Sequence, residues 1–518
     1  MTYDSITRRR LIGGVSGAVA AGALGTPARA QAEVLRVRSY VDIGKLDPLF
    51  MVSRETDGAL CDAIYSRLIR YESGTAWQWQ LDAAEQIEQV DATHVRFRLR
   101  PGIMFSNGYG TMTAEDVQYS FERYLDPALD SPYKGDWTAL DRVEIEDELS
   151  GTIVLKEPYA PLFTTTLPWS AGYILSKRAI EEVGGVFDVT PPAMSGAFLL
   201  SEWVPGQRIG LVRNEDYYGA RSPFDEIVML PIGDDKAAEI AFEAGEIDYT
   251  NVSASSIASM VADPPEGGQI QVRPSETYFW IGMNVEHPLF TDQRVRQAVQ
   301  YAVDVDEIIE AAFFGITPRA TGLVAPGMIG HREANLISGP DLDKARALLA
   351  EAGHPDGFDT TISVLNQTDR VAAAQVIQAQ LAQIGIRVEV LAYESGTYWS
   401  LGNDRDGDDW KDLQLMFLRF TSAPDPGWAT VWFTCDQVGL WNWERWCNEE
   451  YSNLNAEAAR TSDPDSRNAM YVAMQDLMEE SGAYIFVTHE ATAVLYRDGI
   501  VPGNRPNNDT QLSDFRLA

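Results

Sequence analysis

Short apolar strands alternate with amphipathic helices through the second half of this 518-residue chain. Residues 359–369 (DTTISVLNQTD) are predicted to form a strand, residues 371–386 a helix and residues 387–393 (RVEVLAY) a second strand. A strand-helix-strand order favours parallel strands with the helix packed on the sheet. The same order recurs over residues 222–252, without a fixed-period repeat. The pattern therefore predicts an α/β protein with a mainly parallel sheet.

The first thirty residues have the three parts of a removable export signal. A basic start precedes an apolar run from Leu11 to Gly25, and Ala28-Arg29-Ala30 ends the segment with small residues around the expected cleavage point. The run is too short and too rich in glycine and alanine for a membrane-spanning helix. Residues 7–12 (TRRRLI) resemble a twin-arginine signal. The first cysteine is Cys61, so no lipid-anchored cysteine follows the signal, and we expect a soluble periplasmic protein.

The chain is strongly acidic, with 76 Asp and Glu residues, 41 Lys and Arg residues and a net charge of -35. Removing residues 1–30 takes away four arginines and one aspartate, which makes the net charge -38. Nucleic acid and anionic membrane surfaces would repel such a chain. A hydrophobic content of 45% with no long polar tract supports a large core in two or three domains. We therefore expect no nucleic-acid partner.

Two of the three cysteines lie twelve residues apart in the tryptophan-rich segment WFTCDQVGLWNWERWCN, residues 432–448. Outside the cytosol we expect Cys435 and Cys447 to form a disulfide, with two buried thiols as the alternative. Closing a loop of this size would contribute about 3 kcal/mol. Zinc is disfavoured because the nearest histidines lie far away in the sequence, and the acidic turn at 401–412 lacks the spacing of a calcium loop. We expect no metal and no cofactor.

Seven segments, in order along the chain, resemble those of a known family. They are TAEDVQYSFERYLDP (113–127), RNEDYYGARSPFDEIVMLPI (213–232), FEAGEID (242–248), TDQRVRQAVQYAVDVDEII (291–309), DLDKARALLAEAGHPDGF (341–358), QAQLAQIGIRVEV (378–390) and RWCNEEYSNLNAEAARTSDPDSR (445–467). The chain resembles the large extracytoplasmic solute-binding proteins of ABC importers, solute-binding protein family 5, which includes oligopeptide, dipeptide, nickel and opine binders. Members of this family often carry a disulfide that ends in a Trp-Cys pair like Trp446-Cys447.

The resemblance implies a two-lobed α/β fold of the large peptide-binder type, with an extra inserted domain and a two-strand hinge. The expected division is a first-lobe core from 31–70, 191–280 and 488–518, an inserted domain from 71–190 and a second lobe from 281–487, with the strands crossing near 278–284 and 484–490. It also implies that a monomer closes over a small-molecule or short peptide-like ligand. Permease subunits of an ABC importer in the inner membrane would then recognise the closed form.

The resemblance also bears on the choice of ligand. Peptide binders of the family hold the peptide α-amino group with an aspartate three residues before the aspartate of an Asp-Pro pair. The pair is Asp425-Pro426 here, and the position three residues earlier is Ser422. A serine cannot neutralise a buried ammonium, so free-amine peptides are disfavoured unless Asp425 takes the role. Arg370, at the place where dipeptide binders use an arginine on the ligand carboxylate, favours anionic or neutral ligands; a solvated arginine beside Asp369 is the alternative.

Further candidates come from aromatic rings and from small or polar residues near the expected cleft. Some of the rings are expected to stack on the ligand and the others to lie in the core. Met194-Ser195-Gly196 resembles the small-residue turn that lets backbone groups approach the ligand. The complete set of ligand-binding candidates is Tyr40, Ser195, Gly196, Trp280, Asn366, Arg370, Phe420, Thr421, Ser422, Asp425 and Trp428, with Tyr398, Trp399, Trp441 and Trp443 as further rings.

Two other classes of protein remain as alternatives. An exported carbohydrate- or peptide-processing enzyme would need a catalytic constellation, and the sequence has no G-x-S-x-G, H-E-x-x-H, P-loop or dinucleotide-binding motif. Paired carboxylates in a cleft could still serve a glycosidase. A periplasmic chaperone would bind unfolded chains without lobe closure. The sequence favours a non-enzymatic solute receptor for peptide-like compounds, opines or sugar conjugates.

Overall fold

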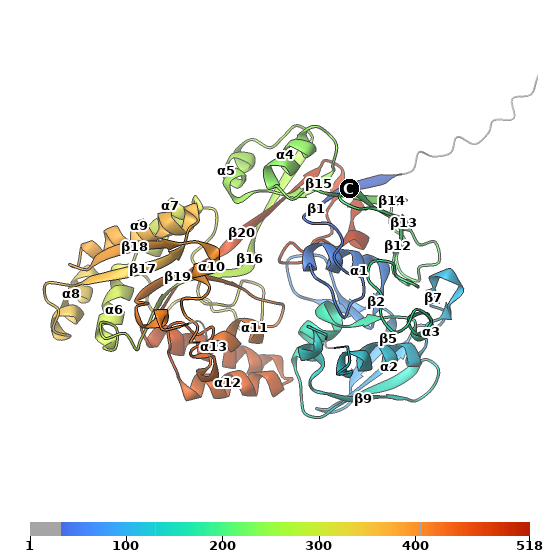
Figure 1. Cartoon of the computed structure of the whole chain (residues 1–518), viewed down its shortest axis with the longest axis horizontal. Coiled ribbons are helices and arrows are strands. Elements are labelled where there is room, and N and C mark those ends of the chain that lie inside the picture. Colours follow the sequence, from blue (N-terminus) through green and yellow to red (C-terminus); the bar gives the residue numbers. More distant parts are fainter. Residues whose placement is uncertain (1–32, 130, 405–406) are drawn as a thin grey trace, which may run out of the picture.

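The computed structural model describes residues 33–129, 131–404 and 407–518. The expected export signal, residues 1–30, lies outside the described residues. In the part of the chain that is described, no helix is both long and apolar enough to cross a membrane. The chain folds into two lobes, with residues of the second half forming the left lobe of Figure 1 and most of the first half forming the right lobe.

A ten-stranded sheet runs through both lobes. Its strand order is β12 (Phe198–Val204), β13 (Arg208–Arg213), β14 (Glu226–Pro231), β1 (Val34–Ser39), β15 (Tyr249–Asn251), β20 (Tyr484–Arg497), β16 (Gly268–Met283), β19 (Leu415–Thr421), β17 (Asp359–Leu365) and β18 (Arg387–Tyr393). The α/β class is confirmed, but the expectation of a mainly parallel sheet is wrong. Only the pairs β1/β14, β1/β15, β17/β18 and β17/β19 are parallel, because β12 to β14 form a meander and the two longest strands pair antiparallel.

The two long strands, β16 and β20, connect the lobes (Figure 1). They pair from Gly268 with Arg497 at one end to Gly282 with Tyr484 at the other. At the first-lobe end β20 pairs with β15, and at the second-lobe end β16 pairs with β19. Their register shifts between Pro274 and Tyr278. Proline has no backbone N–H to donate, so the ladder is interrupted at the point where the strands pass between the lobes.

The first lobe contains two further packed units beside its part of the large sheet. One is a four-stranded sheet of β5 (Ala84–Gln89), β6 (His94–Leu99), β10 (Ser150–Leu155) and β9 (Leu140–Ile145), covered by α2 (Ala114–Glu122). Its core includes Phe97 and the stacked pair Phe121 and Trp137. The other holds α1 (Ala59–Ile64) and α3 (Lys177–Glu182), while α4 (Asp235–Glu243) and α5 (Ala254–Ala262) pack beside the hinge strands.

The second lobe has two hydrophobic cores on the two faces of its part of the sheet. One lies under α6 (Gln293–Ala302), α7 (Val305–Phe313), α8 (Leu342–Glu351) and α9 (Thr368–Ala382). Asp292, Asp304 and Asp341 cap the first three of these helices by accepting backbone N–H groups, which explains where the helices begin. The other core lies beside α11 (Gly427–Thr430), α12 (Glu449–Arg460) and α13 (Pro464–Glu480) and is rich in aromatic rings.

The predicted disulfide is confirmed. Cys435 and Cys447 are bonded with a Cα–Cα distance of 4.5 Å, and Cys61 is buried and free. The bridge closes the loop that carries Trp441, which is exposed, and Trp443, which is buried. It thereby fixes the tryptophan-rich loop against α12, where the Ser452 hydroxyl accepts the backbone N–H of Cys435.

Replacing Cys435→Ser and Cys447→Ser together should lower the free energy of unfolding by about 2 to 4 kcal/mol, because the open loop gains conformational entropy in the unfolded chain. Urea denaturation of the oxidised wild type and of the double variant measures the difference. Reductant should lower the wild type to the level of the variant and leave the variant unchanged. A wild type that keeps its full stability after the bond has been reduced would contradict this account.

Candidate ligand-binding cleft

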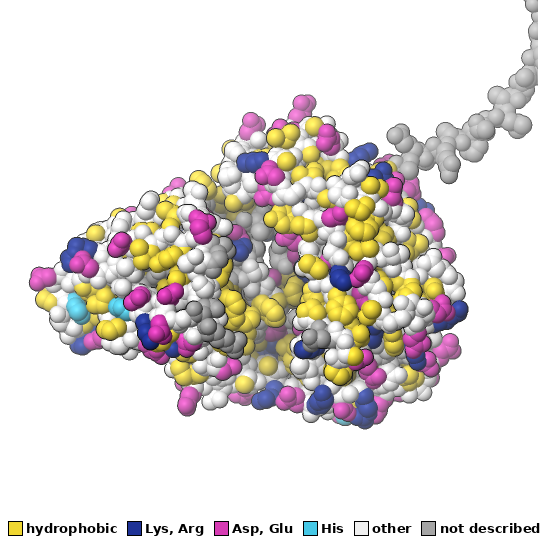
Figure 2. Space-filling model, in the orientation of Figure 1, with side chains coloured by type: hydrophobic (Ala, Val, Ile, Leu, Met, Phe, Trp, Pro, Cys, Tyr) yellow, Lys and Arg dark blue, Asp and Glu magenta, His cyan; other side chains and the backbone are white. Residues whose placement is uncertain are grey.

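The two lobes also meet at the edge far from the hinge strands, so a cleft lies between them (Figure 2). The backbone N–H of Ala160 donates to the carbonyl of Ala459 at 2.9 Å. The Thr164 hydroxyl donates to the Asp425 carboxylate at 2.5 Å. Ala160 and Thr164 belong to the first lobe, and Ala459 and Asp425 belong to the second. The contacts enclose cavities between the lobes, which are the candidate ligand site.

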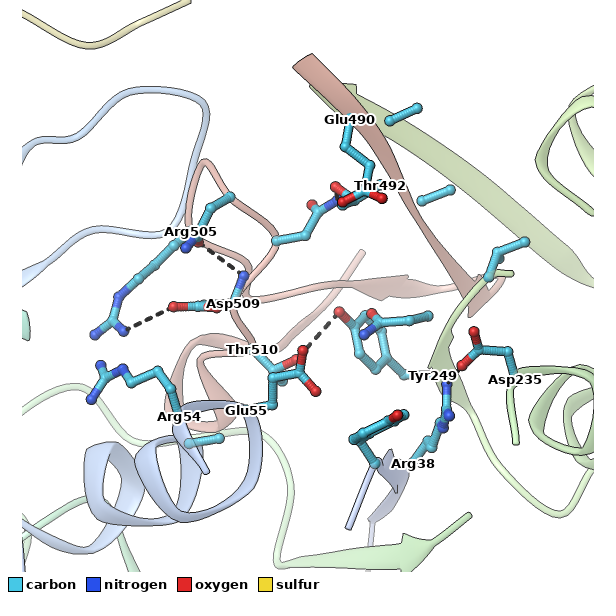
Figure 3. A pocket seen from close by; sticks show the side chains of 18 of the residues that line it. Arg38, Arg54, Glu55, Asp235, Tyr249, Glu490, Thr492, Arg505, Asp509 and Thr510 are labelled. Carbon is cyan, nitrogen blue, oxygen red and sulfur yellow. Dashed lines mark hydrogen bonds and ion pairs between the residues drawn. The ribbon is translucent and has the colours of Figure 1, made fainter. Parts of the chain in front are cut away.

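A charged cavity of about 290 Å³ lies beside the hinge strand β20. Figure 3 shows that its walls come from β1, from the start of α1 and from the loop that follows β20. Its charged lining residues are Arg38, Arg54, Arg505, Glu55, Asp62, Asp235, Glu490 and Asp509. Carboxylates therefore outnumber guanidinium groups by five to three in this lining. Four of the five carboxylates are already in ion pairs: Asp62 and Asp509 with Arg505, Asp235 with Arg38, and Glu490 with Arg419. The cavity is therefore polar, without a large excess of either charge.

Ion pairs hold most of these side chains in place. Arg505, which is fully buried, contacts Asp62 at 2.9 Å, and Arg67 and Arg54 also pair with this carboxylate. Burial opposes the ionisation of Asp62, but the guanidinium groups of Arg505, Arg67 and Arg54 together lower its pKa below the ordinary value. This network fixes the C-terminal loop against α1, although the two segments lie more than 440 residues apart. Asp62 therefore serves structure rather than ligand binding.

Four aromatic rings form an open box of about 220 Å³ at the end of β19. The lining residues of this aromatic box are Phe420, Thr421, Trp428, Trp432 and Trp441. Trp432 stands nearly perpendicular to Trp428, at 5.7 Å and 87°, and to Trp441, at 6.3 Å and 72°. Trp428 is 48% exposed and Trp441 is 41% exposed. Large rings left open to solvent are rare in a folded chain unless a partner or ligand covers them.

A third cavity, of about 440 Å³, has walls from both lobes. Tyr71, Trp77, Trp79, Tyr159 and Phe163 line it from the first lobe, and Met328, Pro424 and Arg467 line it from the second. It lies next to the Thr164–Asp425 contact, because Thr164 is part of its wall. The aromatic part of its wall therefore comes from the first lobe.

The structure places four of the sequence-derived candidates at cavities. Tyr40, 51% exposed, lines the charged cavity, and Phe420, Thr421 and Trp428 line the aromatic box. Trp441, one of the further rings, also lines the box. The rings of Trp280, Tyr398 and Trp443 lie in the core instead.

The polar candidates lie elsewhere. Ser195 and Gly196 are packed against the end of α1, where a Cβ on Gly196 would lie 2.3 Å from the Ala63 carbonyl. Asn366 is exposed and donates to Glu394 at 2.7 Å. Arg370 is buried, pairs with the neighbouring Asp369 and lies over the ring of Phe279 at 4.6 Å.

Ser422 and Asp425 are both buried. The Ser422 backbone N–H donates to the carbonyl of Glu276 at 3.0 Å, which ties it to the hinge. Asp425 accepts hydrogen bonds from Arg467 at 2.8 and 3.1 Å, from the Tyr471 hydroxyl at 3.2 Å and from Thr164. Its carboxylate is thus engaged in an ion pair within the second lobe and in the contact between lobes.

Sequence reasoning missed several residues that line the cavities, among them Trp77, Trp432 and Asp509. Trp432 lies inside the tryptophan-rich segment, so composition alone could have pointed to it. Asp509 lies near the chain end, in a loop that lines the charged cavity next to α1. No local sequence pattern shows that this C-terminal loop lies next to α1.

The comparisons with known proteins identify the class of this chain. The family model of the bacterial extracellular solute-binding proteins, family 5 (middle region), matches residues 78–439. The chain belongs to this family, and it is a ligand-binding protein of solute transport with the two-lobed fold that its sequence predicted.

Individual relatives agree with the family. The glutathione-binding protein GsiB of Escherichia coli K12 is 26% identical over 394 residues, which cover 75% of this chain and 76% of GsiB. HbpA2 from Haemophilus parasuis superposes with a TM-score of 0.82 at 23% identity, over 94% of this chain and 100% of HbpA2. The agropinic acid complex of AgaA from A. tumefacien R10 gives a TM-score of 0.68 at 22% identity, over 94% and 100% of the two chains. These solved structures share the fold of this chain.

Replacing Asp425→Ala should lower the free energy of unfolding by about 3 to 5 kcal/mol, because it leaves the buried Arg467 without a counter-charge. The double variant Asp425→Leu with Arg467→Met should recover most of this loss, since apolar side chains fill the same space. Asp476→Ala is the matched control: its partner Arg332 keeps Glu479, and Asp476 is partly exposed. Urea denaturation measures all four proteins, and equal losses for Asp425→Ala and Asp476→Ala would contradict the role of the buried pair.

Glu444 gives the fold a pH dependence. It is fully buried, accepts the Trp280 indole N–H at 2.7 Å, and burial raises its pKa from 4.5 to about 7. Because the folded pKa is the higher one, this stabilising contribution is complete below pH 4.5 and is lost as the pH rises to about 7. The loss is at most about 3 kcal/mol. Denaturation across this range should show the decline in the wild type and not in Glu444→Gln; parallel pH profiles would refute it.

Proposed function

We propose that this chain captures a peptide-like compound, an opine or a sugar conjugate between its lobes and delivers it to an ABC permease. The aromatic box carries the proposal, because its rings are exposed at the cleft end of β19 and are large enough to cover a small organic ligand. The names of relatives support these ligand classes. GsiB is named for glutathione, and solved relatives are described with the peptide STSA and with agropinic acid.

The cleft favours a ligand with an apolar or planar part and a polar part. Rings supply the surface for the first, and the charged cavity supplies hydrogen-bonding groups for the second. The sequence-based preference for anionic or neutral ligands rested on Ser422 and Arg370. Arg370 is buried and paired within the second lobe, so that preference loses its main support.

The division into domains and the hinge are part of the proposal. A first-lobe core of 31–70, 191–280 and 488–518, an inserted domain of 71–190 and a second lobe of 281–487 agree with the path of β16 and β20 and with the separate hydrophobic cores. Bending at the register shift between Pro274 and Tyr278 would let the lobes move as rigid bodies.

The family supports the remaining assignments. Extracellular solute-binding proteins act outside the cytoplasm, so we propose that the chain is exported, that its signal is removed near Ala30, and that it works in the periplasm as a monomer with inner-membrane permease subunits. We also propose that it is not an enzyme. A receptor returns its ligand unchanged, whereas a processing enzyme would release a product and a chaperone would bind unfolded chains broadly.

Native mass spectrometry of gently purified mature chain should show an additional mass that disappears after denaturation and refolding. Fragmentation of this ligand should identify its class. Trp432→Ala should weaken its rebinding by roughly 1 to 3 kcal/mol, because the ring's stacking surface is lost. Titration calorimetry measures the affinity, with Leu336→Ala, 53% exposed and outside the cavity walls, as control. Unchanged affinity in Trp432→Ala, or chemical conversion of the ligand, would contradict the proposal.

A further inference from the structure

Glu276 lies at the break in the hinge. It belongs to the segment between Pro274 and Tyr278 where β16 and β20 shift register, so it has no strand partner in β20. Its carbonyl accepts the Ser422 backbone N–H at 3.0 Å, which joins it to the end of β19. Its main chain therefore lies between the two lobes, next to the end of β19 that carries the aromatic box.

The carboxyl group of Glu276 is buried without a partner. The residue is 4% exposed, and among the described residues neither carboxyl oxygen accepts a hydrogen bond of standard geometry. Trp77 and Asn507 lie close enough to favour the ionised form weakly. Burial, followed by the negative charge of Asp509, raises the pKa of Glu276 well above its ordinary value. Burial therefore favours the neutral form of this carboxyl group in the ligand-free protein.

Among the described residues, Arg505 carries the guanidinium group that faces Glu276, and it forms an ion pair with Asp62. Of the groups that change the pKa of Glu276, Arg505 has the smallest effect. Its ion pair with Asp62, at 2.9 Å, is the closer contact. Leaving a buried acid without a partner costs free energy, about 1 to 3 kcal/mol for a neutral group. Such a cost is tolerated in folded proteins chiefly where a ligand supplies the missing partner.

The surroundings of Glu276 belong to the walls of two cavities. Trp77 lines the cavity shared by the lobes, while Asn507 and Asp509 line the charged cavity. Asp509 retains 20% exposure of its side chain. A compact cation that reached this point would meet the carboxyl groups of Glu276 and Asp509, which can accept N–H donors of a primary ammonium.

We propose that Glu276 is the cation-binding residue of the ligand site, accepting the ammonium group of a peptide-like ligand with Asp509 beside it. This inference rests on the proposed function, since it assumes that the ligand occupies the cleft. Glu276, a hinge residue, would then bind the ligand's ammonium group, which Ser422 cannot neutralise. A ligand held by both Glu276 and the wall of either lobe would connect binding directly to the strand segment that bends.

Binding of an ammonium converts the Glu276 carboxyl group to a carboxylate and releases its proton to solvent. The charged and titratable groups that face Glu276 are Asp509 and Arg505 from the C-terminal loop and Tyr71 from β3 (Ile69–Tyr71). Burial raises the pKa of Tyr71, so this hydroxyl stays neutral, and Glu276 is the group whose ionisation the cation would change. Affinity for the cation should therefore increase with pH until Glu276 is ionised in the free protein.

A matched pair of peptide pools tests the proposal. Refolded full-length mature protein is immobilised and exposed to a pool of random tripeptides with free amino termini and to the same pool after N-acetylation, and retained peptides are quantified by mass spectrometry. The wild type should retain free-amine members over their acetylated forms by about tenfold or more. Glu276→Gln should abolish this preference. Glu243→Gln, which removes one exposed carboxylate from α4, should behave as the wild type.

The outcomes separate this inference from the proposed function. Glu276→Gln that keeps the wild-type preference, or a wild type that retains acetylated peptides equally well, would reject Glu276 as the cation site while leaving a peptide-like ligand in place. A wild type that retains neither pool would reject the peptide-like ligand class and this inference with it. Glu276→Gln should fold normally, since an amide replaces a neutral acid of equal size; thermal denaturation verifies this.

Proton release gives a second readout that needs no variant. Calorimetric titration of the wild type with a retained free-amine tripeptide, in buffers of different ionisation enthalpy, should show proton release on binding, because the raised pKa of Glu276 favours its protonated form in the free protein. Affinity should fall as the pH is lowered. Binding with no proton release and no pH dependence would overturn the assignment.

Discussion

The antiparallel pair of β16 and β20 is the constraint on which the rest of the structure depends. Both strands belong to one continuous sheet, so the backbone hydrogen bonds that build each lobe also hold the lobes together. A sheet of this kind resists sliding, because a slip of one residue would turn every side chain to the other face. The interruption between Pro274 and Tyr278 removes that resistance locally. The residues of this interruption include Glu276.

The same strands place the chemistry of the cleft. Thr277 pairs with Thr421 across the sheet, which brings the aromatic end of β19 next to the hinge. From β20, Glu490 lines the charged cavity and pairs with Arg419 of β19 at 2.6 Å. The apolar and charged parts of the site therefore lie on β19 and β20, the two strands that flank β16 in one sheet. A ligand that bridges them contacts both sides of the hinge.

Local sequence predicted the parts of the fold whose signals are local. The strand at 359–365, the helix after it and the strand at 387–393 occur as expected, because apolar periodicity and turn residues are features of short segments. The disulfide followed from spacing and compartment. The prediction of a mainly parallel sheet was wrong because β16 pairs with β20, and these segments lie over two hundred residues apart. The periodicity of apolar residues within a segment does not show which strand it will pair with.

The site shows the same limit at the level of single residues. Trp280 and Trp428 are equally plausible ligand contacts in the sequence, yet Trp280 is fully buried with its N–H on Glu444, whereas Trp428 stands open at the box. Arg370 looked like an anion binder, but its guanidinium lies over Phe279 and against its own neighbour. Residue type predicted that the cleft would be aromatic. Only the packing around each side chain determines which of them a ligand can reach.

The contacts at the far edge set the balance between open and closed lobes. Besides the Ala160 and Thr164 hydrogen bonds, they include Gln89 with Ser462 at 3.1 Å and the exposed ion pair of Glu157 with Arg460 at 3.3 Å. Each hydrogen bond contributes about 1 kcal/mol and an exposed ion pair less. Their sum is close to the few kcal/mol that separate two populated states, so they bring the lobes together without fixing them. A ligand that contacted both lobes would shift this balance toward the closed form.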